Sequence, residues 1–195
     1  MATVQKRSGV QRRRWTKDEY YRLGELGFFR GQRVELIEGE LMVQSPQGPL
    51  HFSEVDQVYL LLRQVFGAGY WVRAQGPVDL GQPSEPEPDV SVVPGSRADY
   101  VQAHPTTAVL IVEVSDSTLN YDRRRKASLY ARARIADYWI VNLVDRRIEV
   151  FRDPVPDPTQ HYGYGYSSHS VVVPPGAVTP LALPAVAIPA ADLLP

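Results

Sequence analysis

Two carboxylates and a lysine in the middle of the chain have the residue types and spacing of a hydrolytic site. Asp89 follows Pro88 and opens a strand-like stretch, Glu113 closes an apolar run, and Lys126 lies on the next predicted helix. An ionisable group at the end of an apolar strand is costly to desolvate unless something pairs with it. Carboxylates suit Mg²⁺, with Mn²⁺ as the alternative, and a lysine can orient water or counter developing charge. These residues therefore predict hydrolysis of phosphodiester bonds, with Asp89 and Glu113 as metal ligands.

Three further side chains could support this site. Glu40, on a predicted β-hairpin, could supply a third carboxylate. His51, at the start of a predicted helix, could carry a proton or contact a phosphate. Asp122 lies one turn before Lys126 and could pair with it. Each residue also has an ordinary structural explanation: solvation for Glu40, helix packing for His51, and a surface ion pair for Asp122.

A basic helix follows the second carboxylate. The predicted helix at residues 122–134 contains six basic residues and one acidic residue. Arg123, Arg124 and Arg125 are its densest run, and beside a metal site they would suit a DNA backbone. The alternative is a solvated helix face. Because the net charge is −1, nucleic-acid binding would have to come from such a local patch.

Composition excludes several other classes. The 195 residues, 44% hydrophobic and 22% charged, are typical of a globular protein large enough to bury a core. The absence of cysteine excludes disulfides and thiolate zinc sites and fits a cytoplasmic location. The four histidines lack HxH or HExxH spacing. No apolar stretch approaches the roughly 18 residues that span a membrane, so we expect no membrane partner.

The pattern of elements predicts an α/β fold with a mixed sheet flanked by helices. A capping box at Thr16 begins a short helix. A hairpin is expected at 34–43, helices at 51–66 and 122–134, and strands near 70–80, 89–93, 108–114, 138–141, 147–151 and 170–173. We expect a flexible basic tail at residues 1–14 and a single domain at 15–195. The proline-rich segment 154–195 should pack on that domain, and its Tyr/Gly stretch 162–166 is either a hairpin loop or a base-stacking surface.

An ordered set of motifs resembles the Uma-type family of putative restriction endonucleases, long classed as a domain of unknown function within the PD-(D/E)XK superfamily. The resemblance covers roughly residues 16–190 and rests on residues 34–40, 51, 88–90, 111–115, 121–126 and 138–141. It implies a restriction-endonuclease-like core and a Mg²⁺-dependent endonuclease acting on DNA, with Asp89 and Glu113 as metal carboxylates. The lysine expected two residues after Glu113 is Ser115, and the resemblance places its role on Lys126.

Two other functions fit the same residues. One is a catalytically inactive accessory protein of this fold that binds nucleic acid. The other is a mainly structural protein that self-associates through its apolar C-terminal segment. Because duplex DNA offers two strands, a DNA-cutting enzyme of this kind is expected to be a homodimer.

Overall fold

A six-stranded mixed sheet forms the centre of the molecule. The computed structural model describes residues 11–81 and 83–195, so the first ten residues of the expected tail lie outside the described part. The strand order is β3-β4-β5-β6-β7-β8. Only β5 and β6 are parallel, and the other neighbours are antiparallel. The strands are β3 (Tyr70–Ala74), β4 (Val90–Pro94), β5 (Leu110–Ser115), β6 (Asp137–Asn142), β7 (Arg147–Pro156) and β8 (Tyr164–Val172).

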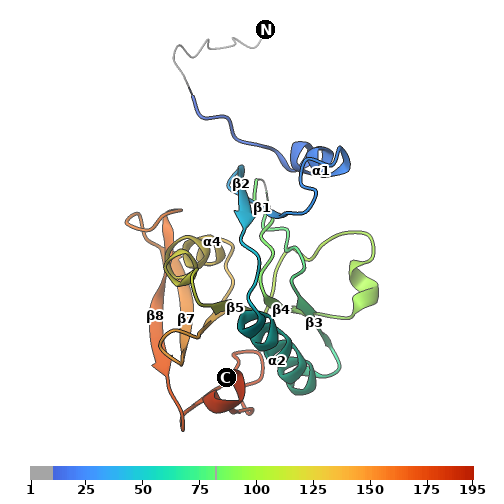
Figure 1. The fold of residues 1–195 in the computed structure, drawn as a ribbon. Coiled ribbons are helices and arrows are strands. Elements are labelled where there is room, and N and C mark those ends of the chain that lie inside the picture. Colours follow the sequence, from blue (N-terminus) through green and yellow to red (C-terminus); the bar gives the residue numbers. More distant parts are fainter. Residues whose placement is uncertain (1–10, 82) are drawn as a thin grey trace.

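Helices cover both faces of this sheet (Figure 1). The helix α2 (Pro49–Phe66) and the C-terminal 3₁₀ turn η3 (Ala190–Leu193) pack on one face, where side chains such as Val58, Val112 and Trp139 form a buried cluster. The helix α4 (Ala127–Arg132) packs on the opposite face with Ile111 and Tyr138. Successive strand residues point to opposite faces, so two cores form on either side of β5. The expected mixed sheet flanked by helices is confirmed.

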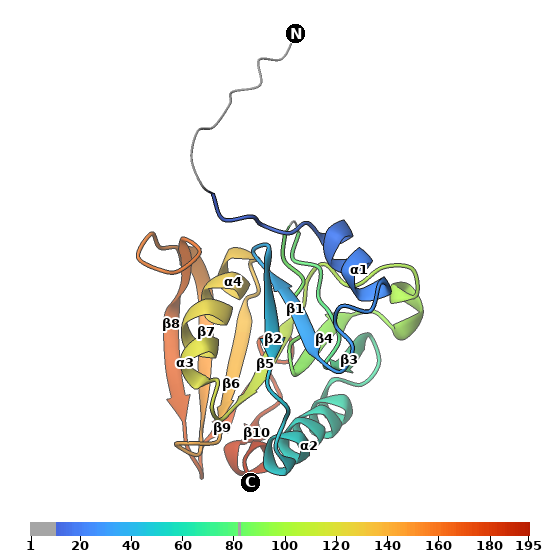
Figure 2. The same cartoon turned by 45° about the horizontal axis from the view of Figure 1, so that its top comes forward.

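A separate hairpin lies beside the main sheet. Its strands β1 (Arg33–Ile37) and β2 (Glu40–Gln44) pair antiparallel. The turn Glu38-Gly39 has positive φ at both residues, the conformation of the tight hairpin turn that the sequence predicts. Figure 2 shows the hairpin between α4 and the N-terminal helix α1 (Lys17–Glu25). The Thr16 capping box that begins α1 is also confirmed.

The connection between β5 and β6 departs from the single expected helix. It consists of a short turn α3 (Leu119–Tyr121), a π-helical turn η2 (Asp122–Lys126) and then α4. A single π turn within a helix is a local widening that is frequent at functional sites. Here Asp122 and Lys126, at the two ends of this turn, are both buried, with 3% and 5% of their surfaces exposed. Sequence periodicity does not reveal this extra residue per turn.

The C-terminal segment packs on α2 and the sheet. Two short strands, β9 (Ala177–Val178) and β10 (Ile188–Pro189), pair antiparallel and lead into η3. Val178, Ile188 and Leu193 belong to the α2-side core. The expectation of a hairpin loop across 162–166 is wrong in part, because Tyr164 and Tyr166 lie within β8. Between β4 and β5 the chain forms a further 3₁₀ turn, η1 (Arg97–Tyr100).

Candidate active site

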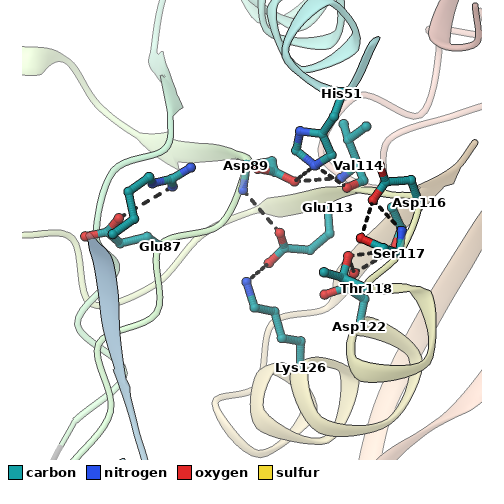
Figure 3. Close-up of polar contacts among 12 residues, drawn as sticks. His51, Glu87, Asp89, Glu113, Val114, Asp116, Ser117, Thr118, Asp122 and Lys126 are labelled. Carbon is teal, nitrogen blue, oxygen red and sulfur yellow. Dashed lines mark hydrogen bonds and ion pairs between the residues drawn. The ribbon is translucent and has the colours of Figure 1, made fainter. Parts of the chain in front are cut away.

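The two predicted metal carboxylates and the lysine lie together at one end of the sheet (Figure 3). Lys126 Nζ is 2.9 Å from Glu113 Oε1. Glu113 Oε2 is 3.3 Å from the backbone nitrogen of Asp89, which donates to it. The backbone N–H of Val114 in turn donates to Asp89 Oδ2 at 2.9 Å. Three residues separated by up to 37 positions thus form one hydrogen-bonded cluster.

Strand pairing explains why these residues meet. Strands β4 and β5 are antiparallel, with Val90 opposite Val112. The residue before β4 therefore lies beside the C-terminal end of β5, which places Asp89 next to Glu113. Lys126 then enters from the turn that follows β5. The site is built from the start of one strand, the end of its neighbour and the helical connection above them.

Both carboxylates are buried. Only 8% of Asp89 and 3% of Glu113 is exposed. Burial, and then the adjacent Glu113 charge, raise the pKa of Asp89 from 3.8 to about 7. Burial alone would lower the pKa of Lys126, but the surrounding carboxylates, Glu113 first, outweigh it and hold that pKa well above the ordinary value. Lys126 is therefore a fixed positive charge at neutral pH.

His51 reaches the cluster from the opposite face of the sheet. It lies in the first turn of α2, and its Nε2 is 2.8 Å from the Val114 carbonyl oxygen. The same nitrogen is 3.6 Å from Asp89 Oδ2. A bond to a carbonyl requires a proton on Nε2. Nδ1 is buried and has no hydrogen-bond partner within the described residues, so His51 belongs to the site and retains one unsatisfied polar atom.

Asp122 lies beside the cluster but does not bond to Lys126 as predicted. Its Oδ2 accepts from Ser115 Oγ at 2.5 Å and from Thr118 Oγ1 at 2.7 Å. Burial, and then the Glu113 charge, raise the pKa of Asp122 to about 7. Lys126 turns toward Glu113 and Glu35 instead. Asp122 therefore anchors the π turn to the end of β5.

Glu40 and the three arginines lie outside the cluster. Glu40 pairs with Arg12 at 3.0 Å and with Arg125 at 3.3 Å, so it does not supply a third carboxylate to the pocket. Arg123 forms an ion pair with the buried Glu149 on β7. Arg124 is exposed. Two members of the predicted DNA-binding run thus already have acidic partners within the chain.

Sequence reasoning missed three residues of the site. Glu35 on β1 is 2% exposed, and its Oε2 lies 3.5 Å from Lys126 Nζ and accepts from the Glu87 N–H at 3.0 Å. Glu87 precedes β4 and, like Glu35, lines the pocket. Tyr130, one turn after Lys126, donates to Glu113 Oε1 at 2.6 Å. The hairpin contains three glutamates, Glu35, Glu38 and Glu40, and only tertiary contacts distinguish Glu35 from the other two.

A cavity of about 240 Å³ opens over the cluster. Its walls come from the hairpin and the loop that follows it, the first turn of α2, and residues 116–122. Glu35, Glu87, Asp89 and Glu113 all line it, whereas Lys126 is the single lysine or arginine among its lining residues. The lining therefore has more carboxylates than basic side chains, and carboxylate oxygens are the ligands that a divalent cation of the Mg²⁺ type prefers.

The number of carboxylates that could bind the cation directly is small. Across residues 11–81 and 83–195, no three His, Asp or Glu side chains are grouped closely enough to hold a metal by themselves. Asp89 and Glu113 are the two that lie side by side. Mg²⁺ usually takes only one or two protein carboxylates and keeps several waters, which is the number of carboxylates that this pair offers.

The fold, a mixed sheet flanked by helices, is that of a restriction-endonuclease-like protein. The model of the Uma2 family, described as "Putative restriction endonuclease", matches residues 18–190, and the chain belongs to this family. A similar fold occurs in the crystal structure of a putative nuclease belonging to DUF820 from Anabaena variabilis. That protein has 16% sequence identity and a TM-score of 0.65, with 91% of this chain and 96% of that chain covered. No curated protein matches the chain.

No helix within the described residues has the length and apolar character needed to cross a membrane.

Proposed function

We propose that this protein is a Mg²⁺-dependent endonuclease that hydrolyses phosphodiester bonds of DNA with a PD-(D/E)XK-type site. The observation that carries the proposal is the convergence of Asp89, Glu113 and Lys126 on one acidic cavity. Membership of a family described as putative restriction endonucleases supports the same reaction class.

In this proposal the acidic and basic residues have different roles. Asp89 and Glu113 would hold the cation. When bound, Mg²⁺ would neutralise charge on the phosphoryl oxygens and make a coordinated water more acidic. Lys126 is held protonated by its carboxylate neighbours, so it supplies positive charge and hydrogen bonds and does not act as a base. His51 contacts the Val114 carbonyl through Nε2, and its Nδ1 is buried without a hydrogen-bond partner among the described residues.

The substrate proposal rests on the family description and on the local distribution of basic residues. Arg124 is exposed within the π turn and is the member of the arginine run most accessible to a phosphate backbone. Arg123 and Arg125 would contribute to DNA binding only by exchanging their present acidic partners for phosphates. A homodimer and a cytoplasmic location stay predictions.

Cleavage assays with matched variants test the proposal. Purified protein would be incubated with supercoiled, linear and branched DNA in Mg²⁺, Mn²⁺ or a chelator. Cleavage by the parent protein should require the cation and should fall by at least about 10³-fold in Asp89→Asn, since loss of a core catalytic group removes several kcal/mol of transition-state stabilisation. Asp18→Asn, an exposed aspartate on α1, is the control and should retain full activity.

The possible outcomes separate the enzyme from a binding module. Cation-dependent cutting that survives in Asp89→Asn would refute the assigned site. DNA binding without cutting of any substrate, with binding unaffected by cation, would instead support the catalytically inactive accessory protein.

A further inference from the structure

Tyr130 forms a hydrogen bond that packing alone does not require. It lies on α4, is fully buried, and its ring packs 5.0 Å from that of Tyr138. The sequence predicts only an inward-facing core residue there. Its hydroxyl, however, donates to Glu113 Oε1 at 2.6 Å. Burial, and then the Glu113 charge, raise the pKa of Tyr130 well above its ordinary value, so the phenol keeps the proton that it donates.

Both oxygens of Glu113 have donors, but the donors differ. Oε1 accepts from Tyr130 and also from Lys126 Nζ at 2.9 Å. Lys126 and Tyr130 are four residues apart, so one stretch of helix supplies both donors. From the described residues, Oε2 receives only the longer 3.3 Å bond from the Asp89 N–H. The carboxylate is therefore fixed through Oε1, and Oε2 is the oxygen left beside Asp89.

We propose that Tyr130 is a positioning residue for the metal site: with Lys126 it fixes the Glu113 carboxylate so that Oε2 is presented, next to Asp89, to a divalent cation. The inference rests on the proposed function, because it assigns a role toward that cation. Groups that orient metal ligands without touching the metal typically change metal affinity or activity 10–100-fold when removed.

The competing explanation is that Tyr130 only satisfies a buried carboxylate. Tyr166 provides the matched control. Its hydroxyl also makes one hydrogen bond inside the fold, to the Ile135 carbonyl oxygen at 2.8 Å, but that acceptor is a backbone group and not a carboxylate of the cluster. Tyr→Phe at either position removes one oxygen and leaves the ring. The two variants should therefore lose comparable folding stability, and only Tyr130→Phe should disturb the cation site.

The experiment measures Mn²⁺ binding by calorimetry and by paramagnetic resonance for the parent, Tyr130→Phe and Tyr166→Phe. Thermal melts and circular dichroism establish that each variant is folded. We expect Mn²⁺ to bind Tyr130→Phe about 10–100-fold more weakly and Tyr166→Phe within about twofold of the parent. In cleavage assays the cation concentration for half-maximal rate should rise for Tyr130→Phe, and the KM for DNA should stay unchanged because Tyr130 does not reach the surface.

A further variant tests whether the effect passes through Glu113. Groups in one network have non-additive effects, so adding Tyr130→Phe to Glu113→Gln should weaken Mn²⁺ binding no further. Suppose that the parent binds Mn²⁺. If Tyr130→Phe binds it as tightly as the parent or more tightly, or if its Mn²⁺ affinity falls no more than that of Tyr166→Phe, the positioning role is refuted and the proposed function stands. If the parent binds no divalent cation, the proposed function fails and this inference fails with it.

Discussion

Replacing Asp89 by asparagine should make the metal-free protein more stable while abolishing its activity. Asp89 is 8% exposed and adjoins the Glu113 carboxylate. Its pKa is raised, so the fold binds the proton more tightly than the unfolded chain does, and at pH 8 the charged form opposes folding. The difference between 3.8 and about 7 corresponds to an upper limit of about 4 kcal/mol. Asparagine keeps an oxygen for the Val114 N–H and has no charge.

We expect Asp89→Asn to gain about 1–4 kcal/mol in free energy of unfolding at pH 8 in chelator, which raises the melting temperature by roughly 2–16 °C for a chain of this size. Calorimetry or urea denaturation measures the gain. Adding Mn²⁺ at 100 times its Kd should stabilise the parent by about 2.7 kcal/mol and leave the variant unchanged. The difference in free energy of unfolding between variant and parent should therefore become smaller. Asp18→Asn controls for a general effect of charge removal.

The opposite stability result would refute this reasoning. If Asp89→Asn melts below the parent in chelator, the carboxylate is a stabilising partner of Lys126 or His51, and its burial has a structural purpose. A parent protein whose stability is indifferent to Mn²⁺ would also contradict the reasoning, since relief of repulsion between Asp89 and Glu113 is what the cation should provide.

Three further predictions concern the surroundings of this pair. Lys126→Ala removes the ammonium group that Glu113 and Glu35 share, so urea denaturation should show that the free energy of unfolding falls by about 3–5 kcal/mol. A fall of less than about 1 kcal/mol would mean that the two buried carboxylates do not depend on Lys126. Asp122→Asn should match the parent near pH 4 and become progressively more stable than it up to pH 7, because a raised carboxyl pKa lowers stability as the proton is lost; a pH-independent difference in thermal melts would contradict the assignment. Arg124→Ala should weaken DNA binding and reduce the slope of log K against log salt by about one, and an unchanged slope in anisotropy titrations would remove Arg124 from the interface.

Local sequence signals predicted most of the fold because they act over short distances. The capping box at Thr16 and the turn at Glu38-Gly39 each depend on neighbouring residues. The apolar run before Glu113 forms β5, which is buried along its whole length in the middle of the sheet. The π turn of residues 122–126 was not predictable in this way, because it is stabilised by contacts of Asp122 and Lys126 with the end of β5.

The sequence singled out two residues at strand ends, Asp89 and Glu113, and two on predicted helices, His51 and Lys126, that lie close together in the structure. Asp89 and Glu113 could be paired in advance because neighbouring strands bring such ends together. Glu40 and Glu35 are equally acidic and lie in the same hairpin, yet Glu40 pairs with arginines and Glu35 faces Lys126. Which glutamate enters the site depends on how the hairpin docks against the helical connection. That docking is a long-range property that no local pattern encodes.

Ser115, at the position where the family resemblance leads one to expect a lysine, helps to explain how Lys126 reaches Glu113 from the helical connection. Ser115 is fully buried at the end of β5, and its hydroxyl donates to Asp122 Oδ2 at 2.5 Å. This bond fixes the first residue of the π turn to the strand that bears Glu113. Lys126, the last residue of that turn, is thereby directed back to the same carboxylate. A lysine at position 115 would need no such anchor, whereas Lys126, four residues after the start of the π turn, reaches Glu113 only if that turn is held close to β5. Ser115, Asp122 and Lys126 therefore act together: the Ser115–Asp122 hydrogen bond holds the start of the π turn against β5, and Lys126 at its end bonds to Glu113.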